Sequence, residues 1–124
     1  MTDFLGIIAV VDDDDSVRGA LWGLLRAAGY QAVTFASAEA FLASQTVATV
    51  DCLVADVNLP GMNGAALVAA LVDAGTPLPA VLITARNDAH TLELIRRGGA
   101  VPHLIKPFSD EELFGAIHTA RSAA

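Results

Sequence analysis

Reactive side chains in this sequence stand at the ends of short apolar segments. Asp56 ends one such segment, four consecutive aspartates at 12–15 follow another, Thr84 ends a third, and Lys106, the only lysine, follows the last. Carboxylates, a hydroxyl and an ammonium group brought to one place could bind a hard divalent cation and hold the oxygens of a phosphoryl group. Asp56 is therefore the candidate nucleophile of the chain.

The acidic run is the first part of this candidate site. Asp12, Asp13 and Asp56 would repel one another if they met at one edge of a sheet. Mg²⁺ would remove the conflict, because it prefers hard oxygen ligands and is commonly held by one or two carboxylates together with a phosphate. The alternative is that residues 12–15 form only a solvated helix start, although four acids exceed what a cap needs.

Lys106 and Thr84 are the second part. Lys106 precedes Pro107, which restrains the backbone and makes the bond between them a candidate for the cis isomer. A lone ammonium beside three acids is a counter-charge and can also hold a phosphoryl oxygen. A plain salt bridge from Lys106 to Asp56 is compatible with that role. Thr84 could be present because threonine favours strands or because its hydroxyl contacts a ligand, and both explanations stay open. Together the groups form a site suited to phosphoryl transfer onto Asp56.

The elements that must position these groups alternate along the chain. Short apolar runs predict strands at 6–11, 31–35, 52–56, 79–84 and 101–105. Helices are predicted to begin near 14–16, at 37, at 65, at 88 and at a capping box over 109–112. Alternation of this kind predicts an α/β fold, a doubly wound parallel sheet with helices on both faces.

The predicted strand order is 2-1-3-4-5, with a switch point between the first and third strands. Asp12 and Asp13 follow the first strand and Asp56 ends the third, so the acids should meet at the crevice where open parallel sheets bind ligands. No repeat, linker or low-complexity segment interrupts the pattern, and residues 1–124 are expected to form a single domain.

Composition restricts the possible functions. The hydrophobic fraction is 54% and the formal net charge is −7, which favours a globular chain and argues against direct binding to nucleic acid. Cys52 is the only cysteine and lies in an apolar segment, so we interpret it as a buried hydrophobe rather than a reactive thiol. No apolar run is long enough to cross a bilayer, and we expect a soluble cytoplasmic protein.

These motifs resemble a known family. The stretches 10–18 (VVDDDDSVR), 56–64 (DVNLPGMNG), 82–85 (LITA) and 105–108 (IKPF) are similar to those of response regulator receiver domains, the flavodoxin-like (βα)5 modules of two-component signalling, and most of all to the FixJ type within the CheY-like superfamily. The likeness spans essentially the whole chain.

The resemblance implies a role for each acid. Asp56 would accept a phosphoryl group from the phosphohistidine of a sensor histidine kinase or a phosphotransfer protein. Asp13 and Asp56 would bind Mg²⁺ directly, Asp12 would act through water, and the Asn58 backbone carbonyl would complete the protein ligands. The chain would then be a signalling domain that catalyses only its own phosphotransfer and dephosphorylation.

The resemblance also implies how the signal leaves the site. Thr84 and Lys106 would hold the phosphoryl oxygens, and the last two helices with the fifth strand would form the output face for a downstream protein, an output domain or a phosphorylation-linked homodimer. The family usually has Tyr or Phe three residues before the lysine, where this chain has His103. His103 is either a polar edge residue or an imidazole that serves as the rotating switch. Arg86 and Asn58 would tune the lifetime of the phosphorylated state.

Two other classes of function fit parts of the pattern. A phosphatase of the haloacid-dehalogenase type also has a nucleophilic aspartate at a strand end, but it needs a second aspartate two residues later, and Asn58 cannot protonate a leaving group. A flavodoxin-like cofactor binder is disfavoured because aspartates replace the glycine-rich phosphate loop. A stand-alone regulator and a domain of a longer DNA-binding protein both stay open.

Overall fold

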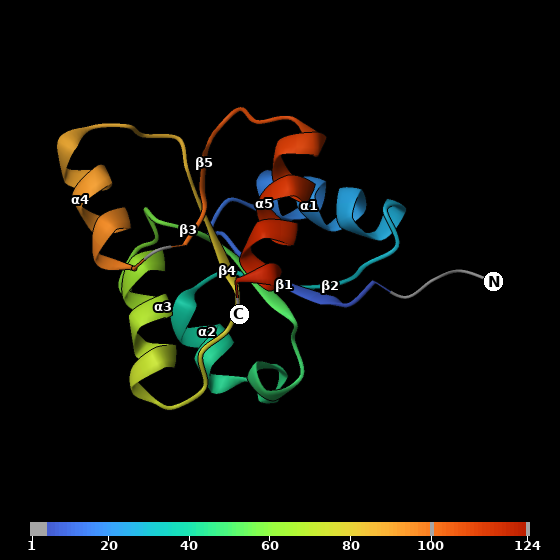
Figure 1. Cartoon of the computed structure of the whole chain (residues 1–124), viewed down its shortest axis with the longest axis horizontal. Helices are drawn as coiled ribbons and strands as arrows, with labels where there is room; N and C mark the ends of the chain where they lie inside the picture. Colours follow the sequence, from blue (N-terminus) through green and yellow to red (C-terminus); the bar gives the residue numbers. More distant parts are fainter. Residues whose placement is uncertain (1–4, 100, 124) are drawn as a thin grey trace.

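Strands and helices alternate along the computed structural model, which describes residues 5–99 and 101–123 (Figure 1). The elements are β1 (Ile7–Val11), α1 (Asp15–Ala27), β2 (Gln31–Phe35), α2 (Ala38–Ala43), η1 (Gln45–Ala48), β3 (Cys52–Asp56), α3 (Gly64–Asp73), β4 (Ala80–Thr84), α4 (Ala89–Arg97), β5 (His103–Ile105) and α5 (Asp110–Ser122). The short 3₁₀ helix η1 is an addition that the apolar pattern did not predict.

The five strands pair in parallel in the order β2-β1-β3-β4-β5. Both the α/β class and the strand order predicted from the sequence are therefore confirmed. The order reverses between β1 and β3, so their carboxyl ends border the crevice at the switch point.

Two hydrophobic layers cover the sheet, and alternate residues of each central strand point into one or the other. In β3, Leu53 and Ala55 join the layer beneath α2, α3 and α4, whereas Cys52 and Val54 join the layer beneath α1 and α5. Figure 1 shows the same division of the helices. Every residue of β3 is buried, so the carboxylate of Asp56 can approach water only at the strand's end.

Each α-helix begins at a polar cap. The side chains of Asp14, Ser37, Asn63, Asp88 and Ser109 accept backbone N–H groups of the helices that follow them. The predicted capping box is confirmed, because the Glu112 carboxylate also accepts the Ser109 N–H. These caps set the helix starts close to the predicted positions.

The predicted boundaries differ most at β5, which begins at His103 rather than at residue 101. Pro102 has no N–H to donate to a ladder, although its carbonyl accepts the Leu82 N–H at 2.9 Å. The predicted starts of β1 and β4 were each one residue early, and α3 begins one residue before its predicted start.

Cys52 matches its sequence interpretation. Cys52 is fully buried, and burial raises the pKa of its thiol to about 12, so it remains a protonated core residue at neutral pH. Trp22 is 44% exposed and lies on the outer side of α1, where the Arg26 guanidinium is 4.8 Å from the centre of its ring. Within the described part of the chain, no helix has the length and apolar character needed to span a membrane.

Gly64 allows α3 to start against the end of β3. A Cβ atom there would lie 2.4 Å from the backbone oxygen of Asp56, which is far inside van der Waals contact.

We expect Gly64→Ala to lower the free energy of unfolding by about 1–3 kcal/mol, measured by urea denaturation. Gly19→Ala on α1 is the matched control. A Cβ atom at Gly19 would have no neighbouring atom within 4 Å, and alanine should stabilise the helix by about 0.5–1 kcal/mol. Equal effects of the two changes would contradict the close-approach argument.

Candidate functional site

The chemically active side chains gather at the carboxyl edge of the sheet. Asp12 follows β1, Asp56 ends β3, Thr84 ends β4 and Lys106 follows β5. Parallel pairing brings these four strand ends to the same edge, although the residues are up to 94 positions apart in sequence. The sheet therefore assembles the set of groups that the sequence pattern singled out.

Three carboxylates form the acidic part of the site. One oxygen from each of Asp12, Asp13 and Asp56 lies within 4.8 Å of the others, and no other such group of His, Cys, Asp and Glu side chains occurs among residues 5–99 and 101–123. Asp12 is fully buried, Asp56 is 7% exposed and Asp13 is open to solvent. Hard oxygen ligands on an accessible rim suit a divalent cation that keeps several of its waters.

The four consecutive aspartates divide into two functions. Asp12 and Asp13 join the cluster, whereas Asp14 caps α1 through the N–H groups of Ser16 and Val17. Asp15 forms an ion pair with Arg18. The helix-start interpretation is therefore correct for the second half of the run.

The positively charged side chain of Arg18, which the sequence pattern did not single out, lies beside the acidic cluster. The Arg18 guanidinium donates to the backbone carbonyl of Asp12 at 2.8 Å while it pairs with Asp15. The spacing of Asp15 and Arg18 along α1 is a signal that could have revealed the pair. Its contact with the Asp12 backbone depends on the tertiary structure.

Lys106 is the counter-charge of the acidic cluster. Its Nζ lies 3.0 Å from an oxygen of Asp12 and 3.0 Å from an oxygen of Asp56. Burial acts to lower the pKa of Lys106, but its hydrogen bonds and charge interactions with Asp56 and Asp12 outweigh burial and raise that pKa. The Lys106–Pro107 peptide is cis, as the sequence suggested, and the Lys106 N–H donates to the Thr84 carbonyl at 2.7 Å.

The two oxygens of Asp56 have different partners. Oδ2 accepts a hydrogen bond from Lys106, and Oδ1 accepts the backbone N–H of Asn58 at 2.8 Å. The carboxylate is thus held in one orientation at the rim of the sheet.

Thr84 is fully buried, and its hydroxyl is already engaged. Its Oγ1 donates to the Asn58 side-chain oxygen at 2.5 Å and accepts the Arg86 N–H at 2.9 Å. The Asn58 amide nitrogen in turn donates to Thr91 of α4 at 3.4 Å. Sequence reasoning missed Thr91, because a threonine within a short helix gives no local signal that it reaches a strand end.

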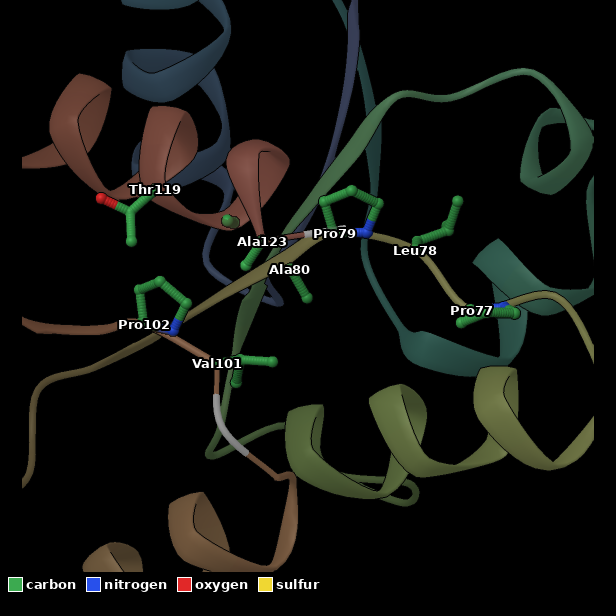
Figure 2. A pocket seen from close by; sticks show the side chains of 9 residues that line it. Pro77, Leu78, Pro79, Ala80, Val101, Pro102, Thr119 and Ala123 are labelled. Atoms are coloured by element: carbon green, nitrogen blue, oxygen red, sulfur yellow. The ribbon is translucent and has the colours of Figure 1, made fainter.

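Two cavities lie near the carboxyl and amino ends of the strands respectively. A cavity of about 320 Å³ adjoins the site between the β3–α3 loop and the start of α4; Asn58, Arg86 and His90 contribute to its lining. A larger one, of about 620 Å³, is mostly apolar and lies where chain segments enter β4 and β5, beside the end of α5 (Figure 2). It has no titratable side chain in its lining, whereas the smaller cavity is lined by Arg86 and His90.

The outer face of β5 is partly apolar. His103 is exposed, as is Ile105 at 41%, and Leu92 of α4 is also 44% exposed. His103 therefore lies at an exposed edge of the sheet rather than inside the site. Its predicted role as a switch stays a prediction.

Comparison with known proteins gives one consistent match. The sequence model described as the response regulator receiver domain matches residues 8–118. Response regulator protein TmoT of Ectopseudomonas mendocina is 36% identical over 100% of this chain, and transcriptional regulatory protein FixJ of Bradyrhizobium diazoefficiens is 35% identical over 93% of it. The crystal structure of FixJ-N is similar with a TM-score of 0.84 and 32% identity, covering 100% of this chain and 98% of that one.

The chain spans about half the length of the curated relatives it matches. It covers 56% of TmoT and 56% of FixJ. The similarity therefore concerns one domain of those proteins.

The ion pairs of Lys106 lead to a prediction about pH. We expect Lys106→Met to lower the free energy of unfolding by about 1–3 kcal/mol at neutral pH, because two carboxylates lose their shared partner. The raised pKa means that the lysine's contribution is full below 10.5, its ordinary value, and is lost as pH rises beyond it. Denaturation of both proteins across this range measures the difference.

Arg97→Met is the control for this experiment, because Arg97 forms only an exposed pair with Glu93 and should change stability by less than about 1 kcal/mol. A loss of stability for Lys106→Met that grew above pH 10.5 would contradict the assignment.

The acidic cluster leads to a second prediction. Mg²⁺ is expected to raise the Tm of the protein saturably, by the equivalent of about 2.7 kcal/mol at about 100 times Kd, because the ion relieves repulsion among the carboxylates. Asp13→Asn should remove most of this shift. Asp15→Asn should retain it, since that carboxylate pairs with Arg18 outside the cluster. Equal Mg²⁺ shifts in both variants would argue against the cluster as the binding site.

Proposed function

Because this chain belongs to the family of response regulator receiver domains, we propose that it accepts a phosphoryl group on Asp56 and so switches its output surface. The observation that carries the proposal is the grouping of Asp56 with Asp12 and Asp13 at one edge of the sheet, where the Lys106 ammonium bridges Asp12 and Asp56. Residues 1–124 would constitute one receiver domain.

The donor is proposed to be the phosphohistidine of a sensor histidine kinase or a phosphotransfer protein. A carboxylate oxygen of Asp56 attacks the phosphorus, the bond between phosphorus and the donor's imidazole nitrogen breaks, and an acyl phosphate forms. The hydrogen bonds from Lys106 and the Asn58 N–H orient the carboxylate before the reaction. The protein's contribution is mainly position and charge.

The residues present fit a magnesium ion. Asp13, Asp56 and the Asn58 carbonyl would hold it directly and Asp12 through water, and the ion would supply neutralisation of charge on the phosphoryl oxygens. Three carboxylates facing one ammonium leave an excess of negative charge at the rim, which supports a cation there.

Lys106 and Thr84 would bind the product. Once Asp56 is phosphorylated, the ammonium that pairs with its carboxylate can hold a phosphoryl oxygen instead. The Thr84 hydroxyl would donate to a second oxygen, for which it must leave its present acceptor, Asn58. The chain would catalyse only its own phosphorylation and dephosphorylation.

The face formed by α4, β5 and α5 is the proposed output surface. Exposed Leu92 of α4, with Ile105 and His103 of β5, would supply apolar and titratable contacts for a downstream protein, an output domain or a second phosphorylated copy. FixJ is named as a transcriptional regulatory protein, but the net charge of −7 argues that any contact with DNA is made by other polypeptide. The cytoplasmic location expected from the sequence belongs to the same proposal.

The phosphatase alternative finds no support. Asn58 occupies the position of the general acid, and its side chain bonds to Thr84 and Thr91 instead of facing a leaving group. The family that matches this chain is a signalling domain.

Acetyl phosphate with Mg²⁺ tests the proposed function. Intact-mass spectra should show addition of one phosphoryl group to the protein, and Asp56→Asn should abolish it, because the amide is not a competent acceptor. Asp73→Asn, at the exposed end of α3, is the matched control and should be phosphorylated like the unaltered chain. Equal phosphorylation of Asp56→Asn would show that Asp56 is not the acceptor.

A further inference from the structure

We propose that the Asn58 side chain is a link between the phosphorylation site and α4, joining the Thr84 hydroxyl to Thr91, and that phosphorylation of Asp56 breaks it. Asn58 is in this sense a positioning residue, and the link a device that couples the state of Asp56 to the start of α4. The inference rests on the proposed function.

A continuous series of hydrogen bonds carries the proposal. The Arg86 N–H donates to Thr84 Oγ1 at 2.9 Å, and the Thr84 hydroxyl donates to Asn58 Oδ1 at 2.5 Å. Asn58 Nδ2 then donates to Thr91 Oγ1 at 3.4 Å. Thr91 also bonds to the carboxylate of Asp88, and both its backbone and its side chain lower the pKa of that group. The series therefore runs from the end of β4 to the N-cap of α4.

The single proton of Thr84 makes this link sensitive to phosphorylation. A threonine hydroxyl has one proton to donate, and here Asn58 accepts it. Because a phosphoryl oxygen is acceptor-only, Thr84 can bind it only by giving up the bond to Asn58. The 2.5 Å bond would then be lost, and the Asn58 amide would be free to leave Thr91 as well.

The contact between Asn58 and Thr91 lies at one of the few buried positions of α4. Thr91 and Ile95 are its only buried residues within the described range 89–97, and Thr91 is a fully buried polar residue. Loss of the Asn58 contact would leave the buried Thr91 hydroxyl with one partner fewer. Ile95 and the partly buried Leu94 would still hold the second half of the helix against the core, so the effect should be largest in the first turn.

Space for the rearrangement is already present. The cavity of about 320 Å³ beside the site is bordered by Asn58, Arg86 and His90, between the loop after β3 and the first turn of α4. Asn58 lines this cavity, so a turn of its amide would be directed into open space. Its backbone N–H, which holds Asp56, is not required to move.

Hydrogen exchange at the backbone amides of α4 tests the link in the full chain. Breaking it should speed exchange in the first turn of α4 about two- to tenfold, as expected for loss of one buried hydrogen bond. Treatment of the unaltered chain with acetyl phosphate and Mg²⁺ should produce this increase, and Thr91→Val should show it before treatment, with little further change afterwards.

Two further variants separate the hydrogen bond from packing. Thr91→Ser retains the hydroxyl and loses the methyl group, so it should exchange like the unaltered chain, whereas faster exchange in Thr91→Ser than in Thr91→Val would overturn the proposal. Thr76→Val is a control for removal of a hydroxyl, because Thr76 bonds only to the Leu71 carbonyl at the far end of α3. It should leave α4 unchanged.

A double-mutant cycle tests the connection through Asn58. Asn58→Ala preserves the backbone groups and the Thr91–Asp88 contact, and it should loosen α4 as Thr91→Val does. The combined variant should be no looser than either single one, because both changes cut the same link. Strictly additive effects would overturn the proposal.

Intact mass on the same samples separates this inference from the function on which it rests. Phosphorylation of the unaltered chain without faster exchange in α4 would overturn the link and leave the proposed function standing. Absence of phosphorylation would overturn the proposed function and the coupling together.

Discussion

The Lys106 ammonium, which bonds to Asp12 and Asp56 at 3.0 Å each, is the interaction on which the site depends. It joins the end of β5 to the ends of β1 and β3 across the sheet edge. Burying carboxylates is costly unless they are paired, and one ammonium offsets only part of the charge of three. The acidic cluster is therefore held together in the folded chain while it keeps an excess of negative charge.

The parallel sheet turns this local balance into a functional site. Five strands that all point the same way bring their carboxyl ends to one edge, and the reversal of order between β1 and β3 leaves a crevice there. The apolar layers on both faces hold the strands rigidly, so the reactive groups emerge from a fixed frame. The match to receiver domains covers residues 8–118, a range that includes Asp12, Asp13, Asp56, Thr84 and Lys106 as well as all five strands except the first residue of β1.

Asn58 contacts both the reactive carboxylate of Asp56 and the helix α4. Its N–H holds Asp56, its side-chain oxygen accepts the Thr84 proton, and its nitrogen reaches Thr91. Three contacts from one residue connect the end of β3 with β4 and α4. In the proposed link, a change in the acceptor of the Thr84 proton would alter a contact in the first turn of α4.

The amino-acid sequence was enough to predict the α/β class, the strand order and which side chains would be available at the sheet edge, because apolar runs of strand length, helix caps and terminal carboxylates are local signals. It also indicated the cis bond before Pro107 and the capping box at Ser109. The contact of Arg18 with the Asp12 backbone, the start of β5 after Pro102 and the contact of Thr91 with Asn58 emerged only in the folded chain. The Thr91–Asn58 contact depends on how α4 packs beside the end of β3, and local sequence signals do not specify the packing of elements that are distant along the chain.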